Sequence, residues 1–162
     1  MQPSAAQSVV VQPRVLAIDL GERRMGLAIS DPLHITAQGL PTAERRNKRE
    51  DMNFIKSLMK KYEAGLIVLG HPINMDGSRG PSAERAERFA AALEKHLGTH
   101  VELWDERLTS VEAHHLMRDA GLGHTERGRN VDQMAATLLL QNYLESKRLR
   151  RGISAERDEQ DD

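Results

Sequence analysis

Apolar and polar positions alternate along the chain in a pattern that predicts strands first and helices afterwards. Two apolar runs, Arg14 to Leu20 and Met25 to Ser30, are separated by a short glycine-containing turn. So short a connection predicts an antiparallel hairpin. A third extended segment, about Ile35 to Leu40, ends at Pro41. We therefore expect an antiparallel meander of three strands at the start of the fold.

Helical patterns and two further strands alternate in the middle of the chain. Apolar residues at helical spacing predict a helix from about Glu50 to Tyr62, which Gly65 should end. Another helix is expected from Pro81 to Leu97, because proline suits the first helical position. The runs Leu66 to Leu69 and Val101 to Trp104 are expected strands. Both follow helical crossovers, so they should lie parallel to the first strand.

The C-terminal part is expected to hold two helices. Thr109 to Glu112 has the form of a capping box and predicts a helix to about Ala120. The last helix should run from about Asn130 to Lys147. The fold class is therefore α/β, a five-stranded mixed sheet flanked by helices. The chain divides into a flexible leader, one domain and a flexible charged tail, over residues 1–13, 14–147 and 148–162.

Composition narrows the possible functions. The 162 residues include no cysteine, which excludes disulfide frameworks, thiol nucleophiles and cysteine-based zinc sites. Lysine and arginine number 23 against 24 acids, so any affinity for nucleic acid must come from local clusters of charge. Aromatic residues make up 3%, too few for a base-stacking platform. No apolar run approaches the roughly 20 residues of a membrane helix, so we expect a cytoplasmic protein with no membrane partner.

Four acids mark the candidate active site. Asp19 ends the first strand, Asp105 and Glu106 end the last strand, and Asp132 lies in the first turn of the last helix. Carboxyl ends of parallel strands meet at one edge of a sheet, where ligands usually bind. Three converging acids would hold two Mg²⁺ or Mn²⁺ ions about 3.5–4 Å apart. Alternation along a strand points Asp105 and Glu106 to opposite faces, so at most one joins Asp19, and Glu106 is favoured.

Structural explanations for the same acids remain open. Asp19 could cap the turn that follows its strand. Asp105 could pair with Arg107, and Asp132 could complement the helix dipole. Taken singly, each acid fits a structural role; their shared edge favours a catalytic one.

Residues that could bind phosphate lie mainly in the predicted turns. The loop from Asn74 to Gly80 precedes a helix N-terminus and fits either an anion cradle or a glycine-rich connector. His71 is expected to be a hydrogen-bonded loop residue rather than a ligand or an acid. Arginines in turns near the expected edge are Arg23, Arg24, Arg79, Arg107, Arg127 and Arg129. The candidate substrate-binding residues are Arg23, Asn74, Arg79, Arg107 and Arg129.

Four motifs, in this order and spacing, resemble those of the YqgF family, also called the RuvX or Holliday junction resolvase-like family. The resemblance covers about Arg14 to Glu145. It implies a ribonuclease H-like fold and a divalent-metal nuclease of the bacterial cytoplasm that matures the 5′ end of 16S ribosomal RNA. Family members were also proposed to resolve four-way DNA junctions. The motifs are Ala17-Ile-Asp-Leu-Gly21 with Gly26, Gly70-x-Pro-x-Asn-Met-Asp-Gly77, Asp105-Glu-Arg-Leu-Thr-Ser110 with Glu112-Ala113, and Val131-Asp-x-x-Ala-Ala136.

The resemblance also implies a site and partners. Its catalytic acids correspond to Asp19, Asp105, Glu106 and Asp132, and the metal ligands to Asp19, Glu106 and Asp132, with Mg²⁺ or Mn²⁺ as the cofactor. The implied partner is precursor rRNA, with branched DNA and the ribosome as further candidates, for a monomer or weak homodimer. Two positions depart from the family pattern: His71 stands where an aliphatic residue is usual, and Ile73 where leucine is common.

Two other functions remain open. The Asp-Leu-Gly turn also resembles the phosphate hairpin of actin-like and sugar-kinase ATPases, which use two copies of the fold around the nucleotide. The length of this chain allows one copy, which speaks against ATP binding. A non-catalytic RNA- or ribosome-binding module is the other alternative, and the intact set of four acids speaks against it.

Overall fold

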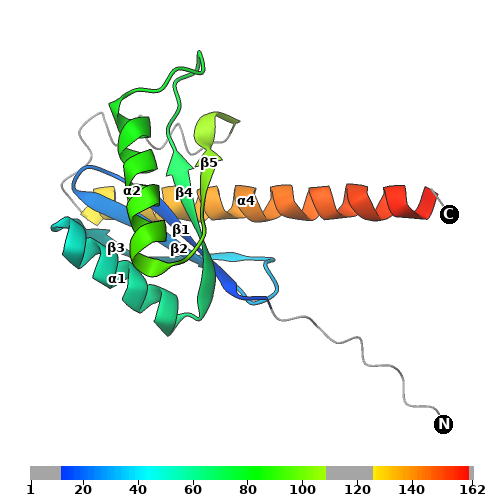
Figure 1. Cartoon of the computed structure of the whole chain (residues 1–162), viewed down its shortest axis with the longest axis horizontal. Coiled ribbons are helices and arrows are strands. Elements are labelled where there is room, and N and C mark those ends of the chain that lie inside the picture. Colours follow the sequence, from blue (N-terminus) through cyan, green and yellow to red (C-terminus); the bar gives the residue numbers. More distant parts are fainter. Residues whose placement is uncertain (1–11, 109–125, 161–162) are drawn as a thin grey trace, which may run out of the picture.

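A five-stranded mixed sheet forms the centre of the computed structural model, which describes residues 12–108 and 126–160 (Figure 1). The strands lie in the order β3-β2-β1-β4-β5. Their bounds are β1 Arg14–Leu20, β2 Arg24–Ser30, β3 Ala37–Glu44, β4 Ala64–His71 and β5 Val101–Asp105. The helices are α1 Lys48–Lys61, α2 Pro81–Leu97 and α4 Glu126–Gln160, with a 3₁₀ segment η1 at Glu106–Leu108.

The strand directions are those that the sequence predicts. β1 pairs antiparallel with β2, and β2 pairs antiparallel with β3, so the first three strands form a meander. β4 pairs parallel with both β1 and β5. The predicted α/β class with a five-stranded mixed sheet is confirmed. The carboxyl ends of β1, β4 and β5 therefore share one edge of the sheet.

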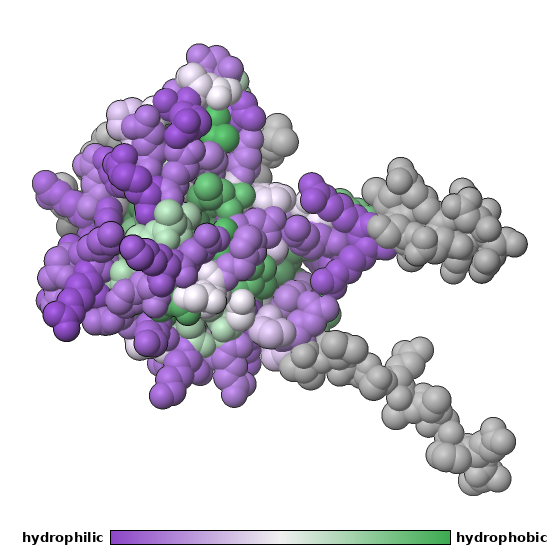
Figure 2. Space-filling model, viewed as in Figure 1, coloured by the Kyte–Doolittle hydropathy of each residue, from purple (hydrophilic) through white to green (hydrophobic). Residues whose placement is uncertain are grey.

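Two apolar cores cover the two faces of the sheet. On β1, Leu16 and Ile18 point into the core beneath α1 and α2, whereas Val15 and Ala17 point toward α4. This alternation follows from the two-residue period of a strand. In Figure 1, α1 and α2 lie on one face, and α4 crosses the other and continues beyond the sheet. Figure 2 shows the α1 and α2 side as mainly hydrophilic, with apolar residues toward the middle of the molecule.

Helix ends follow local sequence signals. The Asn47 side chain accepts a hydrogen bond from the Glu50 N–H at 2.9 Å and caps α1. Pro81 opens α2, as predicted. Gly98 ends α2 with a φ of 63°, a left-handed conformation that glycine adopts without strain.

The prediction that Gly65 ends α1 is wrong. The helix ends at Lys61, and Glu63 takes the left-handed conformation, with a φ of 53°. Gly65 lies inside β4, where a Cβ would stand 2.6 Å from the Cβ of Pro13. The glycine thus serves a close packing contact rather than a helix end.

The predicted bounds of the third strand are also wrong. β3 starts two residues after Ile35 and continues through Pro41 to Glu44. Proline lacks an N–H, but β3 is an edge strand, and its register with β2 shifts between Met25 and Leu27, opposite Pro41. Edges and bulges are where a strand tolerates proline.

The last helix is longer than predicted at both ends. α4 begins at Glu126 and runs to Gln160, whereas the sequence pattern predicted Asn130 to Lys147. The residues after Lys147 hold one glycine and no proline, so their helix propensity allows the extension. The division into leader, domain and tail stays a prediction, and the helix predicted over residues 109–120 lies outside the described residues. Within the described residues, no helix has the length and apolarity to cross a membrane.

Candidate active site at the edge of the sheet

Asp19 lies at the carboxyl end of β1, with 1% of its surface exposed. Alternation along β1 places it on the face that α4 covers, in line with Ala17. Its neighbours on the two adjacent strands are glycines. Gly26 is its partner on β2. On β4, Ile18 pairs with Leu69, so the next residue, Gly70, lies beside Asp19. The two glycines leave space beside Asp19 on this face.

The first glycine lets the backbone of α4 approach the sheet. A Cβ at Gly26 would stand 2.1 Å from the carbonyl oxygen of Asp132, which no side chain could occupy. Asp132 is completely buried at this point. Arg24, two residues before Gly26 on β2, donates a hydrogen bond from Nε to Oδ2 of Asp132 at 2.7 Å. The pair ties the acid of α4 to the strand next to β1.

The second glycine lies under the carboxylate of Glu106. A Cβ at Gly70 would stand 1.9 Å from Oε1 of Glu106 and 3.1 Å from Cδ1 of Leu139 on α4. Glu106 is 3% exposed and begins η1 directly after β5. The Glu106 carboxylate therefore lies on the α4 face of the sheet, over Gly70, which is the neighbour of Asp19 on β4. Asp19, Glu106 and Asp132 thus occupy the same face and the same edge of the sheet.

Asp105 is placed differently. It follows Leu103 by two residues on β5, and alternation directs it toward the α1 and α2 face, away from Glu106. Its carboxylate accepts hydrogen bonds from the Arg107 side chain, the shortest at 2.7 Å, and from the Arg107 N–H at 3.0 Å. The side-chain hydrogen bond from Arg107 is the main cause that lowers the pKa of Asp105. This is the ion pair considered for Asp105 in the sequence.

The predicted substrate-binding residues are mostly engaged within the protein. Arg79 donates from Nε to Oε1 of Glu87 on α2 at 2.7 Å, and His71 lies 3.1 Å from the same oxygen. Asn74 donates to the hydroxyl of Ser78 at 3.0 Å within its own loop. These contacts fit the connector explanation for the loop and the hydrogen-bonded role expected for His71.

Arg107 and Arg129 are also paired, whereas Arg23 has no side-chain partner among the described residues. Arg107 binds Asp105, and Arg129 donates to Oε1 of Glu44 at 2.6 Å. Among the residues that the structure describes, the Arg23 side chain has no hydrogen-bond or ion-pair partner. Arg127 has no described side chain. Roles in substrate binding for these residues stay predictions.

Arg24 was not among the site residues predicted from the sequence, although it was expected to lie near the edge of the sheet that holds the acids. Arg24 and Gly26 are two residues apart on β2, and Gly26 pairs with Asp19. Strand alternation therefore puts Arg24 on the face of Asp19, a signal available in the sequence. Arg45 and Arg46, which lie near the same edge, carried no such signal.

The donor chemistry of the acids suits a hard divalent cation. Mg²⁺ and Mn²⁺ take oxygen ligands, and Asp19, Glu106 and Asp132 offer carboxylates on one face. Across residues 12–108 and 126–160, no three acidic or histidine side chains are grouped closely enough to hold a metal ion. The ion pair with Arg24 occupies Oδ2 of Asp132 in this arrangement.

Comparisons with known proteins give the family. A family model described as "RuvX: Holliday junction resolvase" matches residues 13–146. A protein of Koribacter versatilis named "Putative pre-16S rRNA nuclease" is 46% identical over 155 residues, which cover 96% of this chain and 95% of the relative. A Clostridium beijerinckii protein of the same name is 47% identical, covering 82% of this chain and 96% of the relative.

One solved structure adds a more distant likeness. It is titled "T. thermophilus RuvC in complex with Holliday junction substrate", with a TM-score of 0.49 and 12% identity, covering 79% of this chain and 92% of that one. The family model and the two relatives span nearly all of the domain predicted from the sequence. They confirm the resemblance carried by the four motifs: the chain belongs to the RuvX family.

Proposed function

We propose that this protein is a divalent-metal nuclease that hydrolyses phosphodiester bonds during maturation of the 5′ end of pre-16S ribosomal RNA. One observation carries the proposal: Asp19, Glu106 and Asp132 are buried at one edge of the sheet and on one face of it. The names of the Koribacter and Clostridium relatives support the substrate. With this role we expect the protein in the cytoplasm, with the ribosome as a further partner.

Burial of these carboxylates argues for a charged ligand. Removing a carboxylate from water costs free energy unless positive charge compensates it. Arg24 brings one positive charge to Asp132. Carboxylate oxygens are the ligands that Mg²⁺ and Mn²⁺ prefer, so three buried acids on one face of the sheet favour binding of one of these cations.

Each residue then has a defined task. Asp19, Glu106 and Asp132, which lie on the same face of the sheet, would together hold the cation. Arg24 positions the Asp132 carboxylate through its hydrogen bond. When bound, the cation supplies a water of lowered pKa and positive charge for the leaving oxygen. The apolar core between the sheet and α4, which includes Ala17 and Leu139, keeps bulk water from the buried side of the acids.

A second candidate is cleavage of four-way DNA junctions. The matching family model is described as a Holliday junction resolvase, which favours this reaction. The same acids would serve, because the chemistry at phosphorus is shared. The two candidates differ only in the nucleic acid that reaches the acids.

Cleavage of matched substrates separates these candidates. Wild-type protein is incubated with Mg²⁺ or Mn²⁺ and either a precursor 16S RNA fragment or a four-way DNA junction, and product ends are mapped. We expect cleavage of the RNA at its 5′ side and none in EDTA. Cleavage of the junction alone would favour the resolvase. RNA binding without cleavage under either metal would instead indicate a non-catalytic module.

A further inference from the structure

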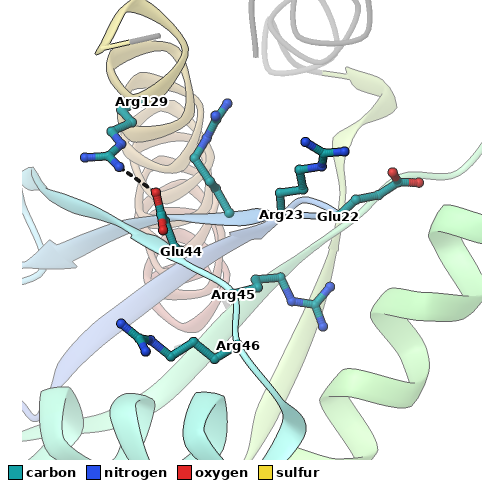
Figure 3. A pocket seen from close by; sticks show the side chains of 7 residues that line it. Glu22, Arg23, Glu44, Arg45, Arg46 and Arg129 are labelled. Carbon is teal, nitrogen blue, oxygen red and sulfur yellow. Dashed lines mark hydrogen bonds and ion pairs between the residues drawn. The ribbon is translucent and has the colours of Figure 1, made fainter. Parts of the chain in front are cut away.

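A cavity of about 550 Å³ lies next to the acid site. Three separate segments form it: the turn between β1 and β2, the end of β3 with the residues that follow, and the start of α4 (Figure 3). Arg24 belongs both to this cavity and to the ion pair with Asp132, so the two sites are contiguous. We call the cavity the arginine pocket; its lining residues are Glu22, Arg23, Arg24, Glu44, Arg45, Arg46 and Arg129.

All the described residues that line the arginine pocket are charged. Five arginines face two glutamates, so positive charges exceed negative ones by three in a protein whose overall formal charge is −1. Among residues 12–108 and 126–160, no aromatic or aliphatic residue lines this cavity. Such a pocket offers hydrogen-bond donors and positive potential but no surface on which a base could stack. Its chemistry suits an anion without a large apolar part.

Arg45 forms a fixed wall of the pocket. Its Nη1 donates to the carbonyl oxygen of Gly21 at 3.0 Å, and its Nε lies 3.6 Å from Oδ2 of Asp51 at the start of α1. Its guanidinium carbon also lies 5.5 Å from the centroid of the Phe89 ring on α2. These contacts hold Arg45 against three elements. Arg45 thereby fixes the position of the β1–β2 turn relative to the start of α1.

Arg23 and Arg46 are the arginines of the pocket for which the described residues supply no side-chain partner. Both side chains are exposed, and neither makes an ion pair or side-chain hydrogen bond within the part of the chain that the structure describes. Arg129, by contrast, is paired with Glu44 (Figure 3). Gathering like charges is unfavourable unless an anion binds among them, and guanidinium groups match phosphate oxygens in shape and charge.

We propose that the arginine pocket is a second phosphate subsite, which binds the sugar–phosphate backbone of the nucleic-acid strand adjacent to the phosphate that is cut. This proposal rests on the proposed function, because it assumes that the acids face a polynucleotide. Arg23 and Arg46 bind backbone phosphates, and Arg45 holds the turn that presents Arg23. Because the described lining offers arginines and no base platform, the subsite reads phosphates and not sequence. The same feature argues against a mononucleotide such as ATP as its ligand.

The test measures binding without catalysis. Fluorescence anisotropy follows a labelled single-stranded RNA, and a DNA of the same sequence, in EDTA over a series of salt concentrations. The variant Arg23→Gln with Arg46→Gln removes both unpaired charges. The matched control, Arg88→Gln with Lys95→Gln, removes two exposed charges of α2 outside the pocket. Thermal unfolding of each variant checks that the fold is intact.

We expect the pocket variant to bind both strands about tenfold more weakly at about 0.1 M salt, since two charge-assisted contacts are lost. The slope of log K against log salt, which is negative, should become less steep by about 1.4, because each phosphate contact on a single strand contributes about 0.7. The variant Arg23→Lys with Arg46→Lys keeps the charges and should retain most of the affinity. The control should bind as wild type does.

A pocket variant that binds like the control, with an unchanged salt slope, would overturn the subsite. Failure of the proposed function has a different signature. Wild-type protein that cuts no substrate, while the pocket variant still loses affinity, would contradict the nuclease assignment and leave the phosphate subsite standing.

Discussion

Arg24 on β2 donates a hydrogen bond to Asp132 on α4 at 2.7 Å, and this ion pair joins the sheet to the helix that covers its acid site. Asp132 is completely buried, and the Arg24 side chain is 11% exposed. Removing one partner of a buried pair leaves a charge in a poor environment. We therefore expect Arg24→Met to lower the free energy of unfolding by about 3 kcal/mol in urea titrations.

The control for this pair is a double-mutant cycle. Asp132→Asn in the Arg24→Met background removes the buried charge and should recover part of the lost stability. Equal stability of Arg24→Met and wild type would show that the pair contributes nothing to the fold.

Gly26 should not tolerate even alanine. Its Cβ would stand 2.1 Å from the backbone carbonyl of Asp132, which can move only if α4 moves. We expect Gly26→Ala to lower the free energy of unfolding by at least about 2 kcal/mol, the cost of overpacking at a rigid contact. Gly152→Ala is the matched control, because Gly152 lies in α4 with nothing within 4 Å of its Cβ position. That change should raise stability by about 0.5–1 kcal/mol.

Gly70 gives a test of Glu106 that separates activity from stability. A Cβ here meets the end of the Glu106 side chain, at 1.9 Å, and that carboxylate can rotate away. Gly70→Ala should therefore cost less stability than Gly26→Ala, but it should displace the acid. We expect the rate of RNA cleavage to fall by about 10²-fold, the usual effect of a 1 Å misplacement. An unchanged rate would mean that Glu106 is not needed where it lies.

Tyr143 on α4 should make stability fall at alkaline pH. Burial raises the pKa of Tyr143, and so does its hydrogen bond to Oε2 of Glu102 on β5, at 2.9 Å. Because the folded pKa lies above the unfolded value of about 10, this contribution is complete below pH 10 and is lost as pH rises through the folded pKa.

Tyr143→Phe removes the ionisable hydroxyl and its hydrogen bond to Glu102. At neutral pH the variant should be less stable by about 1 kcal/mol, the value of one hydrogen bond. Its free energy of unfolding should then decrease less steeply above pH 10 than that of wild type. Parallel curves for the two proteins in that range would exclude the raised pKa of Tyr143 as the cause.

Most of the fold was predictable because local signals agree with the sheet. The short β1–β2 turn required a hairpin, and the crossovers through α1 and α2 required parallel strands. The errors fall where packing decides. Pro41 lies inside β3 because that strand is an edge, and Gly65 lies in β4 because Pro13 packs against it. Neither relation is visible from neighbouring residues alone.

The candidate site was predictable only in part. Strand alternation predicted that Asp105 and Glu106 point to opposite faces, and their side chains do so. The pair of Asp105 with Arg107 could be considered from the sequence, whereas the pair of Asp132 with Arg24 depends on how α4 packs on β2. The arginine pocket could not be predicted, because Arg46 and Arg129 line one cavity only when β3 and α4 are packed together.

Cleavage of precursor 16S RNA by Asp19→Asn, beside Asp105→Asn and wild type, tests the central claim most directly. Asp19 lies buried with the acids on the α4 face, whereas Asp105 is paired with Arg107 on the other side. Initial rates with Mg²⁺ or Mn²⁺ and urea unfolding are measured for all three proteins. We predict a loss of at least about 10³-fold for Asp19→Asn and of less than about tenfold for Asp105→Asn. Full activity of a folded Asp19→Asn protein would contradict the assignment of the site.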